Sequence, residues 1–245
     1  MTEKDVETFV DRNLRGARFI RSMLRGAVMR GVDVDGLDID APWLPDGVLL
    51  VNGVDVVPFV EAELNRRLPG RDLRKAKDPA GLRTAWSALQ SSWDAALARV
   101  ATMSAGTVDI CVDGEWSFAQ TLRHLVLATD AWLGRAVLEA AQPFHPLGLA
   151  GTGTDDDDLD MSIFTAGVPT YDEVLQARAG RVAMVSDFLA TVTPDGLTVP
   201  RKNPWNPQYT ESTLSCLHVI LEEEWEHLRF ALRDLDTISR PLAAG

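Results

Sequence analysis

Four long segments in the last two thirds of the chain carry apolar residues at intervals of three and four, which is the spacing of an amphipathic helix. The first follows Asp78, whose carboxylate can cap it, and the next two open with Ser-x-x-Gln and Thr-x-x-Glu patterns that are typical of capping boxes. The predicted helices span residues 79–100, 117–141, 170–192 and 211–235. Because each helix must bury one apolar face, we expect a mainly α fold built on an antiparallel four-helix bundle.

The N-terminal segment follows a different period. From Leu14 to Ile39 an apolar residue returns every five positions, which is the period of neither a helix nor a strand. This pattern resembles pentapeptide repeats, which coil as a square right-handed β-helix, and an irregular β-rich arm is the alternative. Six such repeats make only about one and a half coils, so the segment must lean on the rest of the chain. The repeating residues are Leu14, Phe19, Leu24, Met29, Val34 and Ile39.

A tight turn is predicted at Asn52 and Gly53, between two short extended pieces, because both residue types tolerate positive φ. We therefore expect a small N-terminal β appendage, pentapeptide-repeat-like, at residues 1–56. The helical domain is expected at residues 57–245, and it begins with a short amphipathic helix over residues 58–68.

The connection from residue 142 to residue 169 is unusually long. It could let the second and third long helices run in the same direction, or it could form a lid. Its acidic run, Asp155–Asp158, lacks the interval, central glycine and terminal glutamate of an EF-hand loop. We therefore interpret this run as a solvated loop.

The formal net charge of -12 argues against a nucleic-acid partner, because the chain would repel a phosphate backbone and has no Lys/Arg cluster with interleaved aromatic residues. No stretch approaches the roughly 18 uninterrupted apolar residues of a membrane span. The acidic N-terminus lacks an export signal, so we expect no membrane contact and a cytoplasmic location. Cys111 and Cys216 each lie in an apolar run and are predicted to be reduced core residues.

The last predicted helix carries a polar pair on an apolar side. Glu223 and His227 are four residues apart and point the same way, among residues such as Val219 and Ile220. An unpaired carboxylate there would be costly to bury unless a cation or a hydrogen-bond donor met it. A divalent metal meets that need, and a carboxylate with an imidazole suits Zn, Ni, Fe or Mn. His218 falls on the opposite face and is expected to face solvent.

A third ligand must come from another helix. His124 is the best candidate, because it lies among apolar residues near the start of the second long helix. His145, in the long connection, could approach the same cavity, and together with Glu224 it is a candidate for proton transfer or orientation. Two plainer interpretations stay open, namely an ordinary ion pair between Glu223 and His227, and a core role for His124.

Two stretches carry a resemblance to a known family. Residues 116–125 (WSFAQTLRHL) and 223–229 (EEWEHLR) resemble the DinB-like (YfiT-like) metalloproteins, and the similarity covers about residues 78–235. It implies a four-helix bundle that binds one divalent ion through three ligands, usually all histidine, with His124 and His227 matching the first and the last. Glu223 stands where a histidine is usual, which makes the site one charge unit more negative. The five-residue period resembles an arm found on some actinobacterial members.

The same resemblance implies metal-dependent chemistry on a small molecule. Some relatives use low-molecular-weight thiols such as mycothiol or bacillithiol for S-transfer or isomerisation, and others are hydrolases. We therefore expect a divalent metal (Zn, Ni, Fe or Mn) as cofactor and consider mycothiol as a co-substrate. One alternative is a noncatalytic binding or dimerisation module, which could form a homodimer. Another is an adaptor that binds a protein partner through its N-terminal segment.

Overall fold

The computed structural model describes residues 7–42, 44–151 and 159–240. The chain forms two compact units, Met1–Ala41 and Pro42–Gly245. The predicted domain boundary after residue 56 falls within the second unit and stays a prediction. The acidic run Asp155–Asp158 lies outside the described residues.

In the first unit positive φ angles recur every five residues, and hydrogen-bonded turns recur every ten. Hydrogen bonds of 2.9 Å from Ala17 N–H to the carbonyl of Leu14, and from Ala27 N–H to that of Leu24, close equivalent turns. The sequence period therefore has a counterpart in the backbone, although residues 7–41 form no paired strands. Its assignment as a pentapeptide-type coil stays a prediction. Positive φ angles between 49° and 78° recur at Asp11, Gly16, Arg21, Gly26, Gly31 and Gly36.

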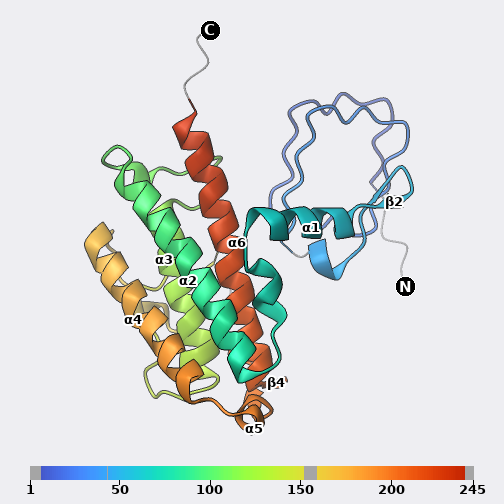
Figure 1. Ribbon diagram of the computed structural model, residues 1–245. Helices are drawn as coiled ribbons and strands as arrows, with labels where there is room; N and C mark the ends of the chain where they lie inside the picture. Colours follow the sequence, from blue (N-terminus) through green and yellow to red (C-terminus); the bar gives the residue numbers. More distant parts are fainter. Residues whose placement is uncertain (1–6, 43, 152–158, 241–245) are drawn as a thin grey trace. The chain divides into compact units, whose positions relative to one another are not determined.

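The second unit is mainly helical, as expected (Figure 1). Its α-helices are α1 (Val57–Arg67), α2 (Pro79–Ala101), α3 (Phe118–Thr129), α4 (Tyr171–Thr191), α5 (Pro194–Leu197) and α6 (Thr213–Ser239). Short 3-10 turns are η1 (Leu44–Asp46), η2 (Arg71–Lys75), η3 (Thr107–Asp109) and η5 (Met161–Ile163), and η4 (Asp130–Arg135) is a π-helical turn that continues α3. The strands are β1 (Leu50–Val51), β2 (Val54–Asp55), β3 (Pro200–Lys202) and β4 (Thr210–Ser212).

Side-chain caps define the starts of three long helices. The Asp78 carboxylate accepts hydrogen bonds from two backbone N–H groups in the first turn of α2. Ser117 with Gln120, and Thr170 with Glu173, form complete capping boxes at the starts of α3 and α4. Because these caps satisfy N–H groups that have no partner within the helix, they fix where each helix begins. The three predicted starts are confirmed.

Two predicted helix boundaries are corrected. α3 and its π-helical continuation end at Arg135, short of the predicted end near residue 141. α6 begins at Thr213, because Ser212 caps it and Glu211 belongs to β4, which pairs antiparallel with β3. The β3–β4 hairpin was not predicted. The β1–β2 hairpin was, and its turn has φ angles of 51° at Asn52 and 83° at Gly53.

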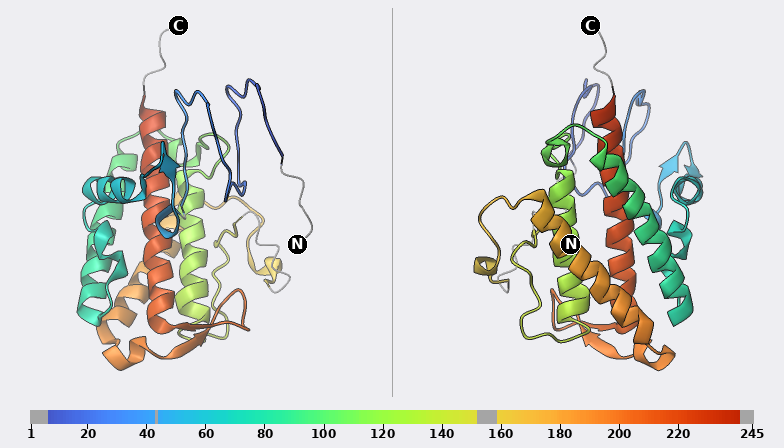
Figure 2. Two further views of the ribbon diagram at one scale, coloured as in Figure 1. Left: turned by 90° about the vertical axis from the view of Figure 1, so that its right-hand side faces the viewer. Right: turned by 60° about the vertical axis from the view of Figure 1, so that its left-hand side comes forward.

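The four long helices pack around a common centre. α3 contacts α4 and α6, and α2 contacts the same two helices. Figure 2 shows that α3 and α4 run in one general direction, whereas α2 and α6 run in the other. The expectation of a wholly antiparallel arrangement is therefore wrong. The long connection lets α3 and α4 run the same way, which was one of the two roles considered for it.

Apolar side chains from all four helices fill the space between them. Burial of each large side chain contributes about 1.5–3 kcal/mol relative to exposure, so this core holds α3 beside α6. None of the helices that the structure describes is both long and apolar enough to cross a membrane. Core residues at most 3% exposed include Leu89, Trp93, Leu122, Leu125, Val185, Leu189, Trp225 and Leu228.

Two expectations for single residues are wrong. Cys111 is exposed, because it lies in an irregular loop before α3, whereas Cys216 is buried as predicted. His218 is half-buried and does not face solvent: its Nε2 donates a 2.7 Å hydrogen bond to the carbonyl of Ala76. This contact arises because η2 packs against α6.

Candidate metal centre

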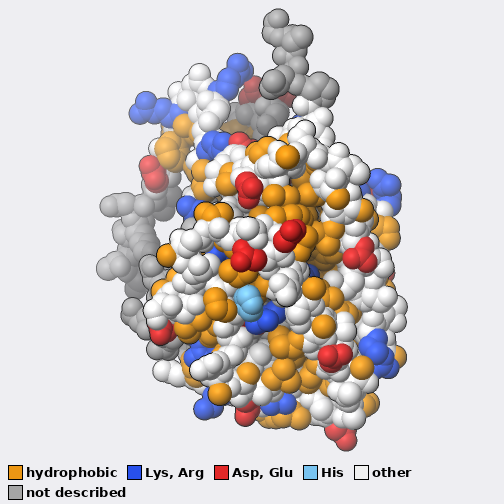
Figure 3. Space-filling view, turned by 90° about the vertical axis from the view of Figure 1, so that its left-hand side faces the viewer, with side chains coloured by type: hydrophobic (Ala, Val, Ile, Leu, Met, Phe, Trp, Pro, Cys, Tyr) orange, Lys and Arg blue, Asp and Glu red, His pale blue; other side chains and the backbone are white. Residues whose placement is uncertain are grey.

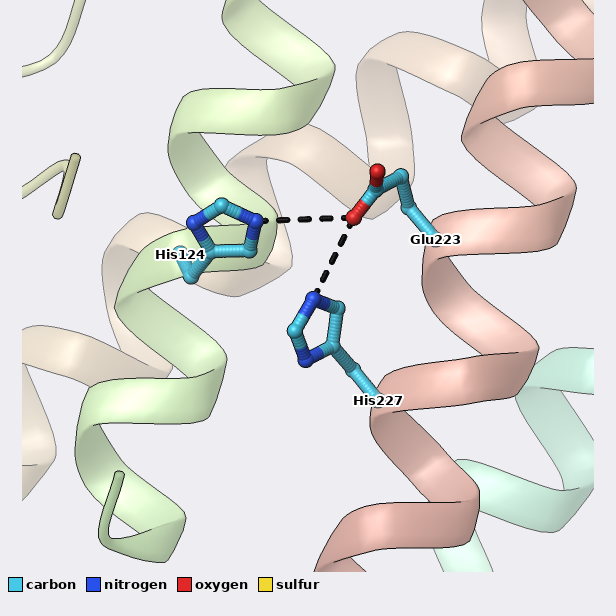
Figure 4. Close-up of side chains that lie close together, drawn as sticks. All are labelled: His124, Glu223 and His227. Carbon is cyan, nitrogen blue, oxygen red and sulfur yellow. Dashed lines mark ion pairs between the residues drawn. The ribbon is translucent and has the colours of Figure 1, made fainter. Parts of the chain in front are cut away.

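His124, Glu223 and His227 come together between α3 and α6 (Figure 4). Nε2 of His124 lies 3.4 Å from Oε2 of Glu223, and Nε2 of His227 lies 3.2 Å from the same oxygen. One nitrogen or oxygen atom from each of the three side chains lies within 4.8 Å of the other two. Two segments about 100 residues apart in sequence therefore converge on one point.

Local helix geometry explains this convergence. Glu223 and His227 are one turn apart on α6, so their side chains lie on one stripe. His124 lies between Leu122 and Leu125 on α3. Both leucines are fully buried in the core between the helices. Because the buried leucines fix the rotation of α3 about its axis, the imidazole of His124 is turned toward α6.

A backbone carbonyl determines which nitrogen of His124 carries the proton. Nδ1 of His124 lies 3.1 Å from the carbonyl oxygen of Leu149, and a carbonyl can only accept. Nδ1 therefore carries hydrogen, and in the neutral ring Nε2 presents a lone pair toward Glu223. Fixing a ligating histidine through its second nitrogen is common in metal sites.

Burial and hydrogen bonding have opposing effects on the pKa values of Glu223 and His227. Burial raises the pKa of Glu223, but the hydrogen bond that His124 donates when its ring is protonated, together with the one from His227, outweighs burial and lowers that pKa to about 2. Burial lowers the pKa of His227, although its hydrogen bond to Glu223 opposes the change. The carboxylate is therefore ionised at neutral pH, and the neutral form of His227 is favoured.

The donor set fits a divalent metal ion. For Zn²⁺, bonds of about 2.0–2.2 Å to nitrogen and oxygen place two tetrahedral ligand atoms roughly 3.3–3.6 Å apart. The separations of 3.4 Å and 3.2 Å from the Glu223 oxygen are close to this range. Moreover, an unprotonated ring nitrogen facing a carboxylate oxygen is repulsive unless a cation or a proton lies between them.

Aromatic rings pack against the two histidines of the site. The ring of Trp116 lies 4.6 Å from that of His124 and stacks at 5.8 Å on that of His227. Phe230 meets His227 edge-on at 5.6 Å. Sequence reasoning used Trp116 only as part of a motif and missed its position as a wall of the site. The signal available was an aromatic residue directly before the cap of the helix that carries His124.

Glu224 is not part of this group. Its side chain is 1% exposed, and its carboxylate accepts a 2.5 Å hydrogen bond from Arg178 of α4. Burial raises the pKa of Glu224, and the charge of Arg178 opposes the change. The guanidinium of Arg178 also lies over the ring of Trp93, 5.9 Å from its centroid. The predicted proton-transfer role of Glu224 stays a prediction, and these contacts offer it no support.

His145 also belongs to a different set of contacts. Its backbone N–H donates a 2.8 Å hydrogen bond to Asp130, and its Nδ1 accepts a 3.1 Å hydrogen bond from the N–H of Leu147. Burial and the nearby Arg181 lower the pKa of His145, while Asp130 raises it. The predicted catalytic role of His145 therefore stays a prediction.

A shallow groove on another face has a different chemical character. Figure 3 shows the molecule from the side on which α4 lies in Figure 1, and hydrophobic side chains form several patches there among charged ones. The groove has no histidine among its lining residues, so it offers no metal site comparable to that between α3 and α6. It is lined by Leu138, Gly180, Ala183, Met184, Asp187, Phe188 and Thr191.

Comparison with known proteins places most of the chain in one family. The model described as the DinB superfamily matches residues 59–231, which is more than two thirds of the chain. The matched region runs from α1 into α6 and contains His124, Glu223 and His227. No curated protein and no solved structure matches the chain.

Proposed function

The chain belongs to the DinB superfamily, and we propose that it is a four-helix-bundle metalloprotein that holds one divalent ion through His124, Glu223 and His227. The observation that carries this proposal is the approach of two imidazole nitrogens to one carboxylate oxygen, at 3.4 Å and 3.2 Å. The mutual packing of α2, α3, α4 and α6 supports the bundle.

The donor set suits Zn, Ni, Fe or Mn. Two imidazoles with one carboxylate is a ligand set found in catalytic zinc sites and in non-haem iron sites. A divalent ion held by three protein ligands supplies a Lewis acid that lowers the pKa of a bound water or thiol. Trp116 and Phe230 provide apolar walls that would exclude bulk water from one side of a bound small molecule.

The proposed reaction is S-transfer, isomerisation or hydrolysis of a small molecule. The YfiT-like motif around His124 and His227 favours a low-molecular-weight thiol such as mycothiol as co-substrate, and water is the other nucleophile. The three side chains are 16%, 27% and 13% exposed, for His124, Glu223 and His227 respectively, which leaves the site partly open to solvent. A small molecule can therefore reach it without unfolding of the helices.

Metal analysis of protein purified without an affinity tag tests the proposal. We expect about one divalent ion per chain after loading with Zn²⁺, Ni²⁺ or Mn²⁺, and much less in His124→Ala and His227→Ala. The loaded protein is then assayed with mycothiol and a panel of electrophiles, and with ester and amide substrates for hydrolysis. Metal content near zero after loading would remove the basis of the proposal.

A second function has its own supporting observation. The contacts of Glu223 with His124 and His227 also suit a structural ion pair, provided that one imidazole is protonated. In that noncatalytic module, His124→Ala and His227→Ala would lower the melting temperature, while no metal would bind and no turnover would change. Loading with metal would then leave the melting temperature of the natural chain unaltered.

A further inference from the structure

The segment from His145 to Leu149, called the strap below, runs along α3 and is tied to it at both ends. At its start, the backbone N–H of His145 donates to Oδ2 of Asp130 at 2.8 Å. At its end, the backbone N–H of Leu149 donates to the carbonyl of Arg123 at 3.2 Å, and the Leu149 carbonyl accepts from His124. The strap therefore connects the π-helical turn η4 with the proposed metal site.

The first anchor is a buried ion pair. Asp130 opens η4 and is 1% exposed, and Arg181 of α4 reaches it with two hydrogen bonds, Nε to Oδ1 at 2.7 Å and Nη2 to Oδ2 at 3.1 Å. Bidentate pairs of this kind hold a carboxylate in a defined orientation. Burial raises the pKa of Asp130, and Arg181 together with the His145 N–H opposes the change. Asp130 thus presents a fixed acceptor to the strap.

The second anchor lies beside the ligand itself. Nε of Arg123 donates to the carbonyl of Leu147 at 3.0 Å, so the side chain and the backbone of Arg123 both hold the strap. Within the strap, the N–H of Leu147 donates to Nδ1 of His145, and the N–H of Gly148 donates to the carbonyl of His145 at 2.9 Å. These internal bonds make the strap a compact turn, so a displacement at Asp130 would be passed to Leu149.

We propose that the Asp130–Arg181 pair positions the metal site, because it fixes the strap whose Leu149 carbonyl orients the imidazole of His124. This inference rests on the proposed function, and it adds positioning residues that touch neither the ligands nor a bound molecule. A π-helical turn inside an α-helix is often retained at functional sites, and here it supplies the acceptor that starts the strap. Groups that hold a ligating histidine in this way typically change metal affinity by about 10–100-fold.

The test uses two variants that release the strap at opposite ends. Asp130→Ala removes the first anchor, and Arg123→Gln removes the side-chain bond to Leu147 while leaving Asp130 intact. Arg74→Gln is the control, because it breaks another buried ion pair, with Glu61 at 2.6 Å, which makes no contact with the strap. Hydrogen–deuterium exchange of the strap peptide is measured in metal-free protein, and Zn²⁺ affinity is measured by competition with a chelating dye.

We expect both variants to speed exchange of the strap amides in the metal-free protein and to weaken Zn²⁺ binding about tenfold. Arg74→Gln should lower the melting temperature and change neither property. Unchanged exchange of the strap amides in the folded variants would overturn the inference. Faster exchange combined with a Zn²⁺ affinity equal to that of the natural chain would overturn it as well. If Asp130→Ala does not fold, Arg181→Gln, which breaks the same ion pair from the α4 side, takes its place and decides between these results. Absence of Zn²⁺ binding by the natural chain would instead overturn the proposed function, and exchange would still report whether the strap is anchored.

Discussion

Glu223 and Glu224 are consecutive residues of α6, yet their carboxylates belong to two different polar clusters. Glu223 faces the histidines of the proposed metal site, at 3.2 Å from Nε2 of His227. Glu224 is turned about 100° further around the helix, into the core, where it pairs with Arg178. One helix therefore supplies a solvent-reachable proposed ligand and a buried, paired carboxylate from adjacent positions, and the two can be tested separately.

The first prediction concerns the carboxylate ligand. Glu223→Ala removes one of three proposed ligands, so we expect divalent-metal affinity to fall by at least about 100-fold. Glu223→His restores three ligands and should retain one ion per chain, with a different preference among Zn²⁺, Ni²⁺ and Mn²⁺ because the site gains one charge unit. Metal content by elemental analysis and affinity by competition titration check both results. Glu222→Gln, at the preceding position, is the matched control, and a loss of affinity there equal to that in Glu223→Ala would contradict the assignment.

Local interactions explain which features could be predicted from sequence. The starts of α2, α3 and α4 depend on caps formed within four residues, at Asp78, Ser117 and Thr170, so the pattern alone locates them. The approach of Glu223 to His227 follows from one helical turn. His124 could be proposed because it lies among apolar residues near the start of a predicted helix, and the family motif also matches it, but no local rule brings residue 124 to residue 223.

Features that depend on packing between distant segments were missed. Cys111 lies between Ile110 and Val112, and such an apolar run is typical of a buried segment. In the structure this segment is a loop, and Ile110 is itself 45% exposed. His218 sits on a polar helical face, and the packing of η2 onto α6 covers it in a way that periodicity cannot reveal. The Leu149 carbonyl could not be found either, because a backbone group has no signature in the sequence.

The second prediction concerns the buried pair beside the site. Glu224→Leu leaves the charge of Arg178 buried without its partner, so the free energy of unfolding should fall by about 3–5 kcal/mol. The double variant, with Arg178→Met added, should recover most of this loss, because neither charge then remains in the core. Urea denaturation of the two single variants and the double variant measures the coupling free energy between Glu224 and Arg178. A double variant as unstable as the sum of the singles would contradict a direct pair, and metal binding should persist in a folded double variant.

The third prediction concerns the two thiols. Cys111 is exposed, whereas Cys216 is fully buried and burial raises its pKa to about 11. Because the thiolate is the reactive form, Cys216 should be inert in the folded chain. We therefore expect Ellman's reagent to modify one thiol rapidly under native conditions and the second only after denaturation. Cys111→Ser should abolish the rapid phase, and a rapid phase that survives this change would show that Cys216 is accessible.

The fourth prediction concerns stability at alkaline pH. Burial raises the pKa of Tyr171, the first residue of α4, to about 12 from an ordinary value of 10.0. Between these two values the unfolded chain has lost the phenolic proton while the folded chain still holds it, so the folded state binds more protons and its stability must fall as pH rises. The contribution of Tyr171 is fully present below pH 10, and the decline ends near pH 12. Buried Cys216 acts in the same direction, so the comparison must be between the natural chain and Tyr171→Phe.

Tyr171→Phe removes the phenol and with it this part of the pH dependence. In urea denaturation between pH 9 and pH 11.5, the free energy of unfolding of Tyr171→Phe should therefore decline less steeply than that of the natural chain. A phenolate absorbance titration gives an independent check, because the chain has only two tyrosines and the other, Tyr209, is 65% exposed. The absorbance change lost in the variant should be the part centred near pH 12. Equal slopes in the two proteins, or loss of a step centred near pH 10, would mean that the phenol of Tyr171 is not packed against the helical core.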